Sequence, residues 1–113
     1  MDCIFCKIIA GEIPSKKAYE DDTVLAFHDI EPAAPVHVLI IPKKHVASVM
    51  ELGAEDGGLV AHMFEVAKKL AEELGVAEKG FRLTINTGDE GGQTVKHLHM
   101  HLLGGRGFGW PPG

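Results

Sequence analysis

Hydrophobic and polar residues follow two different periods along the chain. Thr23–Ile30 and Val36–Pro42 are rich in β-branched and apolar residues, which predicts two strands separated by a stiff EPAAP turn. Phe81–Thr87 and Val95–Leu103 alternate between apolar and polar residues, which predicts two more strands. The glycine-rich GDEGGQ loop joins this second pair of strands.

The period changes to three or four residues between about Asp56 and Leu74. This spacing predicts one long amphipathic helix that is closed by Gly75. The apolar stripe of this helix consists of Leu59, Met63, Val66, Leu70 and Leu74. A short helical turn is predicted within CIFCKIIAGEIP, where Gly11 and Pro14 stop it.

Together these elements predict an α+β fold with a mainly antiparallel sheet, because strands lie on both sides of one long helix in the sequence. We expect residues 1–113 to form a single domain, because no internal repeat, low-complexity tract or long linker divides them. A chain of 113 residues buries about two thirds of the surface that its unfolded form exposes.

Composition and charge narrow the classes of partner. The net charge of −5 argues against general affinity for nucleic acid or anionic lipid, which requires a basic surface. No apolar run approaches the ~20 residues that span a bilayer. The first residues, MDCIFC, lack a charged leader and a cleavage site, so we expect a cytoplasmic protein without a membrane partner.

The segment KHLHMHLLGG contains three histidines, His97, His99 and His101, which stand two residues apart. On a strand they project from one face, with Cα atoms of adjacent histidines ~7 Å apart and those of the outer two ~13 Å apart. Two of them can share one zinc ion, but all three cannot, because imidazole binds zinc at about 2.0–2.1 Å. Surface histidines on a solvated face are a poor explanation of so regular a pattern.

Two functions remain for the row of histidines: a metal site completed by other ligands, or acid–base or nucleophilic chemistry on an anion. The adjacent GDEGGQTV favours the second, because its backbone N–H groups, Gln93 and Thr94 suit phosphate oxygens. Imidazole titrates near pH 6.5, so the row offers a neutral nucleophile beside cationic partners. No G-x-S-x-G motif occurs, which argues against serine hydrolase chemistry.

The C-x-x-C pair at Cys3 and Cys6 is a second chemical motif. In a cytoplasmic protein this spacing suggests a metal site or a redox pair before a structural disulfide.

Several stretches resemble the histidine triad (HIT) family, and in particular its Hint branch. They are FCKIIAGEIP, LAFHDIEPAAPVHVLIIPKKH, the NTG turn, GGQTVKHLHMH with the signature HLHMHLL, and the closing WPPG. The resemblance covers essentially the whole chain. It implies a small homodimer with one long and one short helix and a mainly antiparallel five-stranded sheet that continues across the interface. It also implies cleavage of purine nucleoside phosphoramidates, and related aminoacyl or acyl nucleotides, to the nucleoside monophosphate.

The resemblance assigns catalytic roles to three histidines. His99, the middle of the motif, is implied to be the nucleophile that forms a nucleotidyl-histidine intermediate. Its Nδ1–H then needs an acceptor to fix the tautomer, and a strand backbone carbonyl is well placed. His101 is implied to donate to the phosphate. His37 matches the family's fourth histidine and is implied to assist the leaving group and the water through His101.

The resemblance also implies a nucleotide-binding site. Asp29 matches the ribose ligand, although its FHDI context alone equally suits a turn aspartate. The residues implied to line the base pocket are Phe5, Ile8, Phe27, His28 and Ile30. Asn86, Gln93 and Thr94 are implied to contact the phosphate or leaving group, with threonine where the family usually has serine. Trp110 is implied to cross a dimer and shape leaving-group preference, whereas its ordinary role is packing.

Bacterial-type relatives imply a structural zinc site formed by Cys3, Cys6, His45 and His97. Eukaryotic Hint proteins generally lack the second cysteine, so an empty thiol pair and a redox pair remain alternatives. No βαβ pattern surrounds the cysteines to support a thioredoxin-like role.

Other functions compete with phosphoramidate hydrolysis. The Fhit branch, which hydrolyses dinucleoside polyphosphates, shares the triad but not the WPPG tail. The uridylyltransferase branch ends its motif with glutamine, where this chain has His101. A nucleotide-binding or scaffold module with incidental hydrolysis is a third possibility, and a zinc enzyme that uses all the histidines as ligands is a fourth. The mostly apolar base pocket does not choose between adenine and guanine.

Overall fold

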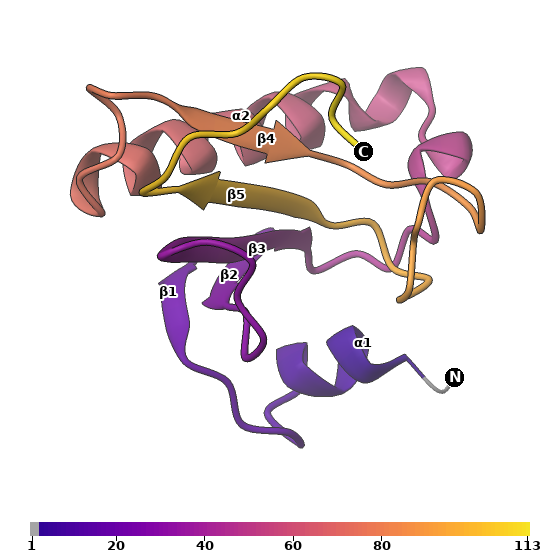
Figure 1. The fold of residues 1–113 in the computed structure, drawn as a ribbon. Coiled ribbons are helices and arrows are strands. Elements are labelled where there is room, and N and C mark those ends of the chain that lie inside the picture. Colours follow the sequence, from indigo (N-terminus) through magenta and orange to yellow (C-terminus); the bar gives the residue numbers. More distant parts are fainter. Residues whose placement is uncertain (1–2) are drawn as a thin grey trace.

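A five-stranded antiparallel sheet forms the middle of the molecule (Figure 1). A computed structural model describes residues 3–113. The strands lie in the order β1-β2-β3-β5-β4, and every neighbouring pair is antiparallel. Their bounds are Lys17–Glu20 (β1), Val24–His28 (β2), Val36–Pro42 (β3), Phe81–Thr84 (β4) and Met100–Gly104 (β5). The α+β prediction is confirmed.

Two α-helices pack against this sheet. The long helix α2 spans Gly57–Glu73, close to its predicted range, and Gly75 follows it with a φ of 76°. The short helix α1 spans Ile4–Ile9 and lies well apart from α2 (Figure 1). Short 3₁₀ turns at Val49–Glu51 and Ala54–Asp56 lead into α2. None of the helices in the described part of the chain is long and apolar enough to cross a bilayer.

Both faces of the sheet are covered, which explains why β2 and β3 are almost continuously apolar. Successive side chains of a strand point to opposite faces. Those packed with α2 include Val24, Ala26, Val38, Ile40, Met100 and Leu102. Those packed with α1 are Leu25, Phe27, Leu39 and Ile41. The catalytic candidates of β5 therefore face the α1 side of the sheet.

Three predicted strands are shorter than expected. β2 spans Val24–His28 rather than Thr23–Ile30. β4 ends at Thr84 rather than Thr87, and β5 begins at Met100 rather than Val95. His97 and His99 therefore precede the strand that was expected to carry them. The partner strand β3 ends at Pro42, which has no backbone N–H to donate to a neighbouring strand. The Pro42 carbonyl accepts a hydrogen bond from the His97 ring at 2.8 Å. The alternation nevertheless persists, because Leu98 and Met100 are buried in the α2-side core.

Candidate active site

His99 stands just before β5 with its ring orientation fixed by the backbone. Its Nδ1 lies 2.7 Å from the His97 carbonyl oxygen, which can only accept, so Nδ1 carries the proton. The remaining nitrogen, Nε2, therefore keeps its lone pair. The Phe5 ring meets the His99 ring edge to face, with centroids 5.2 Å apart. Only 5% of His99 is exposed, so its ring is buried and its Nδ1–H is held by the backbone.

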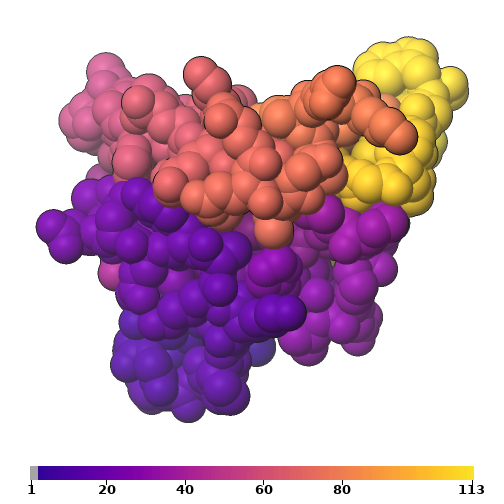
Figure 2. Space-filling view, turned by 90° about the vertical axis from the view of Figure 1, so that its left-hand side faces the viewer, coloured from indigo at the N-terminus to yellow at the C-terminus, as the bar shows by residue number. Residues whose placement is uncertain are grey.

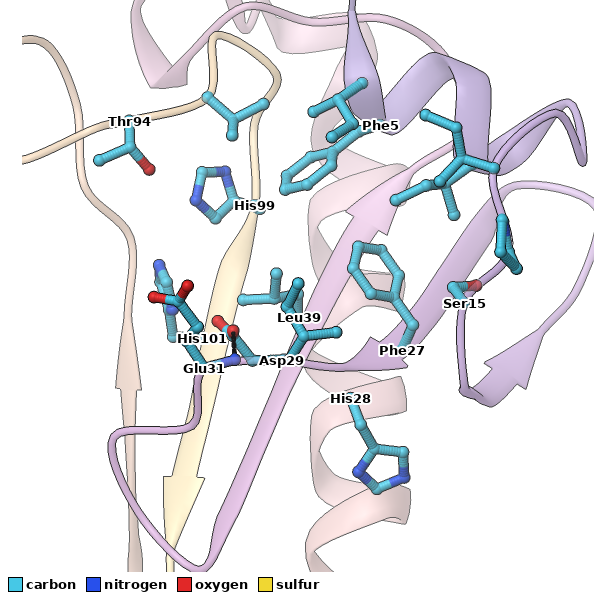
Figure 3. Close-up of a pocket in the computed structure, with 16 residues that line it drawn as sticks. Phe5, Ser15, Phe27, His28, Asp29, Glu31, Leu39, Thr94, His99 and His101 are labelled. Atoms are coloured by element: carbon cyan, nitrogen blue, oxygen red, sulfur yellow. Dashed lines mark hydrogen bonds between the residues drawn. The ribbon is translucent and has the colours of Figure 1, made fainter.

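Two hydrogen bonds in series fix the protons of the two other catalytic candidates. The Ala33 N–H donates to His37 Nδ1 at 3.0 Å, so the His37 proton resides on Nε2. That nitrogen lies 2.9 Å from His101 Nδ1 and donates to it. The His101 proton is consequently on its own Nε2. Figure 3 shows the His101 ring at the same end of the cavity as Asp29.

His101 Nε2 is buried and has no hydrogen-bond partner within the described residues. Burial, reinforced by the neighbouring rings of His99 and His37, lowers the pKa of His101 to about 4. Burial also lowers the pKa of His37, against the opposing effect of Asp29. Both rings are therefore neutral near pH 7. A buried N–H donor without an acceptor costs about 1–3 kcal/mol, so this site is prepared for a ligand oxygen.

Asp29 lies beside these histidines at the end of β2. Its carboxylate accepts the Glu31 N–H at 2.8 Å and lies 3.5 Å from His37 Nε2. Its backbone N–H donates to the His37 carbonyl, which links the end of β2 to the start of β3. The side chain is 21% exposed and retains oxygen lone pairs for hydroxyl donors.

These groups open into a cavity of about 490 Å³ between α1 and the sheet (Figure 3). Phe5 and Phe27 form an apolar end, with their rings edge to face at 5.5 Å. His99, His101 and Asp29 form a polar end. An apolar slot therefore leads to the Nε2 atom of His99 and to the unpaired N–H donor of His101.

Most of the residues predicted to bind a nucleotide line this cavity. They are Phe5, Ile8, Phe27, His28, Asp29, Ile30 and Thr94, together with His99 and His101. Sequence reasoning missed Ile4, Ile13, Pro14, Ser15, Glu31, Leu39 and Val95. Ile4 could have been predicted from the sequence, because it stands four residues before Ile8 and so lies on the same face of the helix.

Three of the residues predicted to bind the nucleotide do not line the cavity. The Gln93 side chain is buried in its own loop, where it donates to the carbonyls of Ala47 and Val95 and accepts from Gly88 N–H. Asn86 is partly exposed outside the cavity. Trp110 is 84% exposed on the C-terminal tail, the yellow segment that forms one corner of Figure 2.

A second cluster joins α1 to the approach to β5. The ligand atoms of Cys3, Cys6, His45 and His97 all lie within 4.8 Å of one another. The two Nδ1 atoms are 3.1 Å apart, and each sulfur lies within 3.3–3.6 Å of at least one of them. His97 Nε2 donates to the Pro42 carbonyl at 2.8 Å, which leaves its Nδ1 lone pair directed into the cluster.

This geometry suits a tetrahedral metal ion. Bond lengths of about 2.3 Å to sulfur and about 2.0–2.1 Å to nitrogen place neighbouring ligands roughly 3.3–3.8 Å apart. Burial lowers the pKa of His97, which favours the neutral form that ligation requires. Without a metal, burial and the adjacent Cys3 sulfur raise the pKa of Cys6. Soft sulfur and imidazole donors in this number can hold a metal such as zinc.

Asp29, His37 and His101 also place three ligand atoms within 4.8 Å of one another, but the proton arrangement opposes a metal there. His37 Nδ1 already accepts the Ala33 N–H, so metal binding at His37 Nε2 would require the ring to lose its only proton. This group is better suited to hydrogen bonding with a substrate.

Known proteins resemble the chain over most of its length. The HIT domain model matches residues 10–108. An uncharacterised HIT-like protein of Synechococcus elongatus is 54% identical over 112 residues, covering 99% of this chain and 97% of that protein. The purine nucleoside phosphoramidase of Escherichia coli K12 is 52% identical over 108 residues, covering 96% and 91% of the two chains.

Solved structures show the same fold. A HIT family hydrolase from Legionella pneumophila superposes with a TM-score of 0.98 at 52% identity, covering 99% of this chain and all of that one. A HIT family hydrolase from Clostridium thermocellum superposes with a TM-score of 0.93 at 55% identity, covering 96% of this chain and 94% of the other.

Proposed function

The chain belongs to the HIT family, and from that premise we propose that it hydrolyses the P–N bond of purine nucleoside phosphoramidates. Related aminoacyl and acyl adenylates are further substrates. The products are the nucleoside monophosphate and the free amine or acid. The observation that carries the proposal is the pairing of a free Nε2 lone pair on His99 with an unpartnered Nε2–H on His101 in one cavity.

In the first step His99 Nε2 attacks the α-phosphorus and forms a new P–N bond. The bond from phosphorus to the leaving amine breaks, its electron pair stays on the amine nitrogen, and that nitrogen takes up one proton from water. His99 keeps its Nδ1 proton, and the His97 carbonyl at 2.7 Å stabilises the positive charge that develops on the ring. The unpartnered His101 Nε2–H donates to the phosphate oxygen that gains charge.

In the second step water attacks the phosphorus of the nucleotidyl-histidine. The P–Nε2 bond breaks and the electron pair returns to His99, while the water loses one proton to solvent. Protons taken up and released thus balance over the cycle. His37 assists both steps through His101, because its Nε2–H holds the donor tautomer of that ring. Two easier displacements replace one difficult displacement.

Recognition of the nucleotide uses both ends of the cavity. The purine lies between the apolar side chains of α1 and β2, and Asp29 accepts from the ribose hydroxyls. Thr94 contacts the phosphate from the loop before β5. For Gln93 and Asn86 to contact the phosphate or leaving group, their loop must rearrange, because Gln93 now bonds to backbone groups.

We further propose that zinc binds the Cys3, Cys6, His45 and His97 cluster in a structural role. The four donors occupy all four tetrahedral positions, so none remains open for substrate. The ion would hold the N-terminal end of α1 against the segment that precedes His99.

We also propose a homodimer whose sheet continues across the interface and in which Trp110 reaches the partner's site. The 84% exposure of Trp110 in the single chain supports this placement. Sedimentation equilibrium should give about twice the 12.2 kDa chain mass, and a monomer at micromolar concentration would exclude the dimer.

The test of the activity is release of AMP from adenosine phosphoramidate. The wild-type protein should release AMP, and His99→Ala should reduce kcat by at least about a thousandfold, because the nucleophile is lost. If the wild type and the variant bind AMP but are equally inert, the protein is a nucleotide-binding module. A zinc enzyme that uses the histidines as ligands would instead lose activity at once on chelation.

A further inference from the structure

We propose that Glu31 makes the pocket selective for substrates whose leaving group carries a positive charge. This inference rests on the proposed hydrolase function and names a substrate class within it. Amines with a second, cationic group would be preferred, and polyphosphate leaving groups would be disfavoured.

Glu31 occupies the reacting end of the cavity. In Figure 3 its carboxylate lies at the end that holds His101 and Asp29, whereas Phe27 and Ser15 lie at the opposite end. The Glu31 N–H donates to the Asp29 carboxylate at 2.8 Å, which fixes the backbone that carries it. Displacement at phosphorus is in line, so the leaving group departs on the side away from the attacking His99, which in Figure 3 is the side that holds His101 and Glu31.

No described residue serves the Glu31 carboxylate as a counterion. It is exposed, and within residues 3–113 it forms neither an ion pair nor a hydrogen bond through its side-chain oxygens. The nearby Arg106 guanidinium does not serve it, because that group donates to the carbonyls of Ala33 and Gly107 and lies over the Phe108 ring. The negative charge of Glu31 is therefore available to a ligand.

The charge inventory of the cavity is unusual for a phosphate site. Among the described residues, two carboxylates, those of Asp29 and Glu31, line it, and no lysine or arginine does. Burial keeps His101 neutral near pH 7 by lowering its pKa to about 4. The α-phosphate, with a single charge, is thus met by N–H donors rather than cations.

These charges favour some leaving groups over others. Each additional phosphate adds negative charge that the cavity does not neutralise and that Glu31 repels. A leaving amine with a terminal ammonium instead gains an attraction to Glu31. An exposed charge pair of this kind changes binding by roughly three- to fivefold, and the effect weakens as salt is added.

The experiment compares three adenosine 5′-phosphoramidates of equal chain length. Their leaving amines are 1,5-diaminopentane, pentylamine and 5-aminopentanoate, which differ mainly in terminal charge. For the wild type at low salt, kcat/KM should fall from the cationic to the neutral to the anionic substrate, about three- to fivefold at each step. Raising the salt to about 0.5 M should compress this range.

Two variants assign the selectivity to one carboxylate. Glu31→Gln should bring the three kcat/KM values within about twofold of one another. Glu78→Gln is the matched control, because it removes the same charge from an exposed residue that does not line the cavity. It should keep the wild-type ranking.

The outcomes separate this inference from the proposed function. If the wild type and Glu31→Gln hydrolyse all three substrates with the same ranking, the selectivity role of Glu31 is wrong while the hydrolase function stands. If the wild type hydrolyses none of them, the hydrolase function is wrong and the inference falls with it.

Discussion

At the residue scale, the candidate site is defined by where three imidazoles hold their protons. Backbone groups set each position: the His97 carbonyl fixes His99, and the Ala33 N–H fixes His37 and, through it, His101. The result is one free lone pair and one free N–H in the same cavity. Catalysis of this kind needs defined tautomers more than it needs charge, and the lowered pKa values of His37 and His101 agree with that.

The lowered pKa of His101 predicts how stability changes with pH. Below about pH 6.5 the unfolded chain protonates this histidine, whereas the folded protein keeps it neutral until about pH 4. The unfolded state then binds more protons, so the free energy of unfolding must fall as the pH falls through this window.

Chemical denaturation between pH 4 and 7 measures this effect. The wild type should lose about 1–2 kcal/mol more than His101→Gln over the window, after allowance for partial solvent exposure. Carboxylates titrate in both proteins, so the difference isolates His101. If the wild type and His101→Gln lose the same free energy of unfolding between pH 7 and 4, the pKa of His101 is not lowered in the folded state.

Arg106 offers a second test at this scale. Its guanidinium donates twice to the Ala33 carbonyl, at 3.1 and 3.0 Å, and the same residue's N–H fixes His37. We expect Arg106→Ala to let the His37 ring populate both tautomers and to lower kcat about tenfold, with KM changed less than twofold. Nitrogen-15 NMR of the histidine rings reports the tautomers directly.

Arg82→Ala is the matched control for this positioning role. Arg82 also lies over the Phe108 ring, at 5.1 Å, but it donates to Gly109 rather than to Ala33. It should preserve the wild-type His37 spectrum. A wild-type spectrum in Arg106→Ala as well would remove Arg106 from the positioning of His37.

At the element scale, α1 connects the metal cluster to the nucleotide pocket. Cys3 and Cys6 lie at its N-terminal end, and Phe5 and Ile8 from the same helix line the cavity. A helix of six residues is not stable alone, so it depends on these contacts. Metal binding should therefore affect nucleotide affinity more than the chemical step.

Replacement of His45 by alanine tests this link. Protein purified without chelator should contain about one zinc per chain, and His45→Ala should retain less than about a fifth of that. KM should rise several-fold while kcat changes less, because α1 loosens. His62→Ala, which removes a histidine of α2 outside the cluster, should keep its zinc. Less than about 0.2 zinc per chain in the wild type would end the zinc proposal.

The elements differ in how far the sequence reveals them. The stripe of α2 and the apolar runs of β2 and β3 were predictable, because burial imposes their periods. β1 was not, because it is a four-residue edge strand that pairs with β2 and whose end residues, Lys17 and Glu20, are exposed. The start of β5 was also missed, because a side-chain bond to Pro42 replaces ladder hydrogen bonds there.

At the scale of the whole molecule, the two faces of the sheet have different roles. The α2 side of the sheet holds the larger core, and the α1 side holds the cavity and the metal cluster (Figure 1). Alternation across the HLHMHLL segment assigns Leu98, Met100 and Leu102 to the first side and His99 and His101 to the second. The row of histidines was therefore predictable as a functional face.

Other parts of the site required three-dimensional structure. Glu31 and Leu39 reach the cavity through turns and sheet register that local sequence does not encode. The glycine-rich sequence around Gln93 likewise does not predict that its side chain is buried within its own loop. The resemblance to the HIT family supplied roles for residues whose local sequence suggested only core or turn positions.

The central claim is that His99 forms a transient covalent bond to phosphorus, and mass spectrometry of acid- or denaturant-quenched protein tests it most directly. During turnover of adenosine phosphoramidate, a fraction of the wild-type chain should gain the mass of an adenylyl group, located on the peptide that contains His99. His99→Ala should show no such adduct. Turnover without any adduct in the wild type under rapid quenching, or an adduct on another residue, would contradict the proposed mechanism.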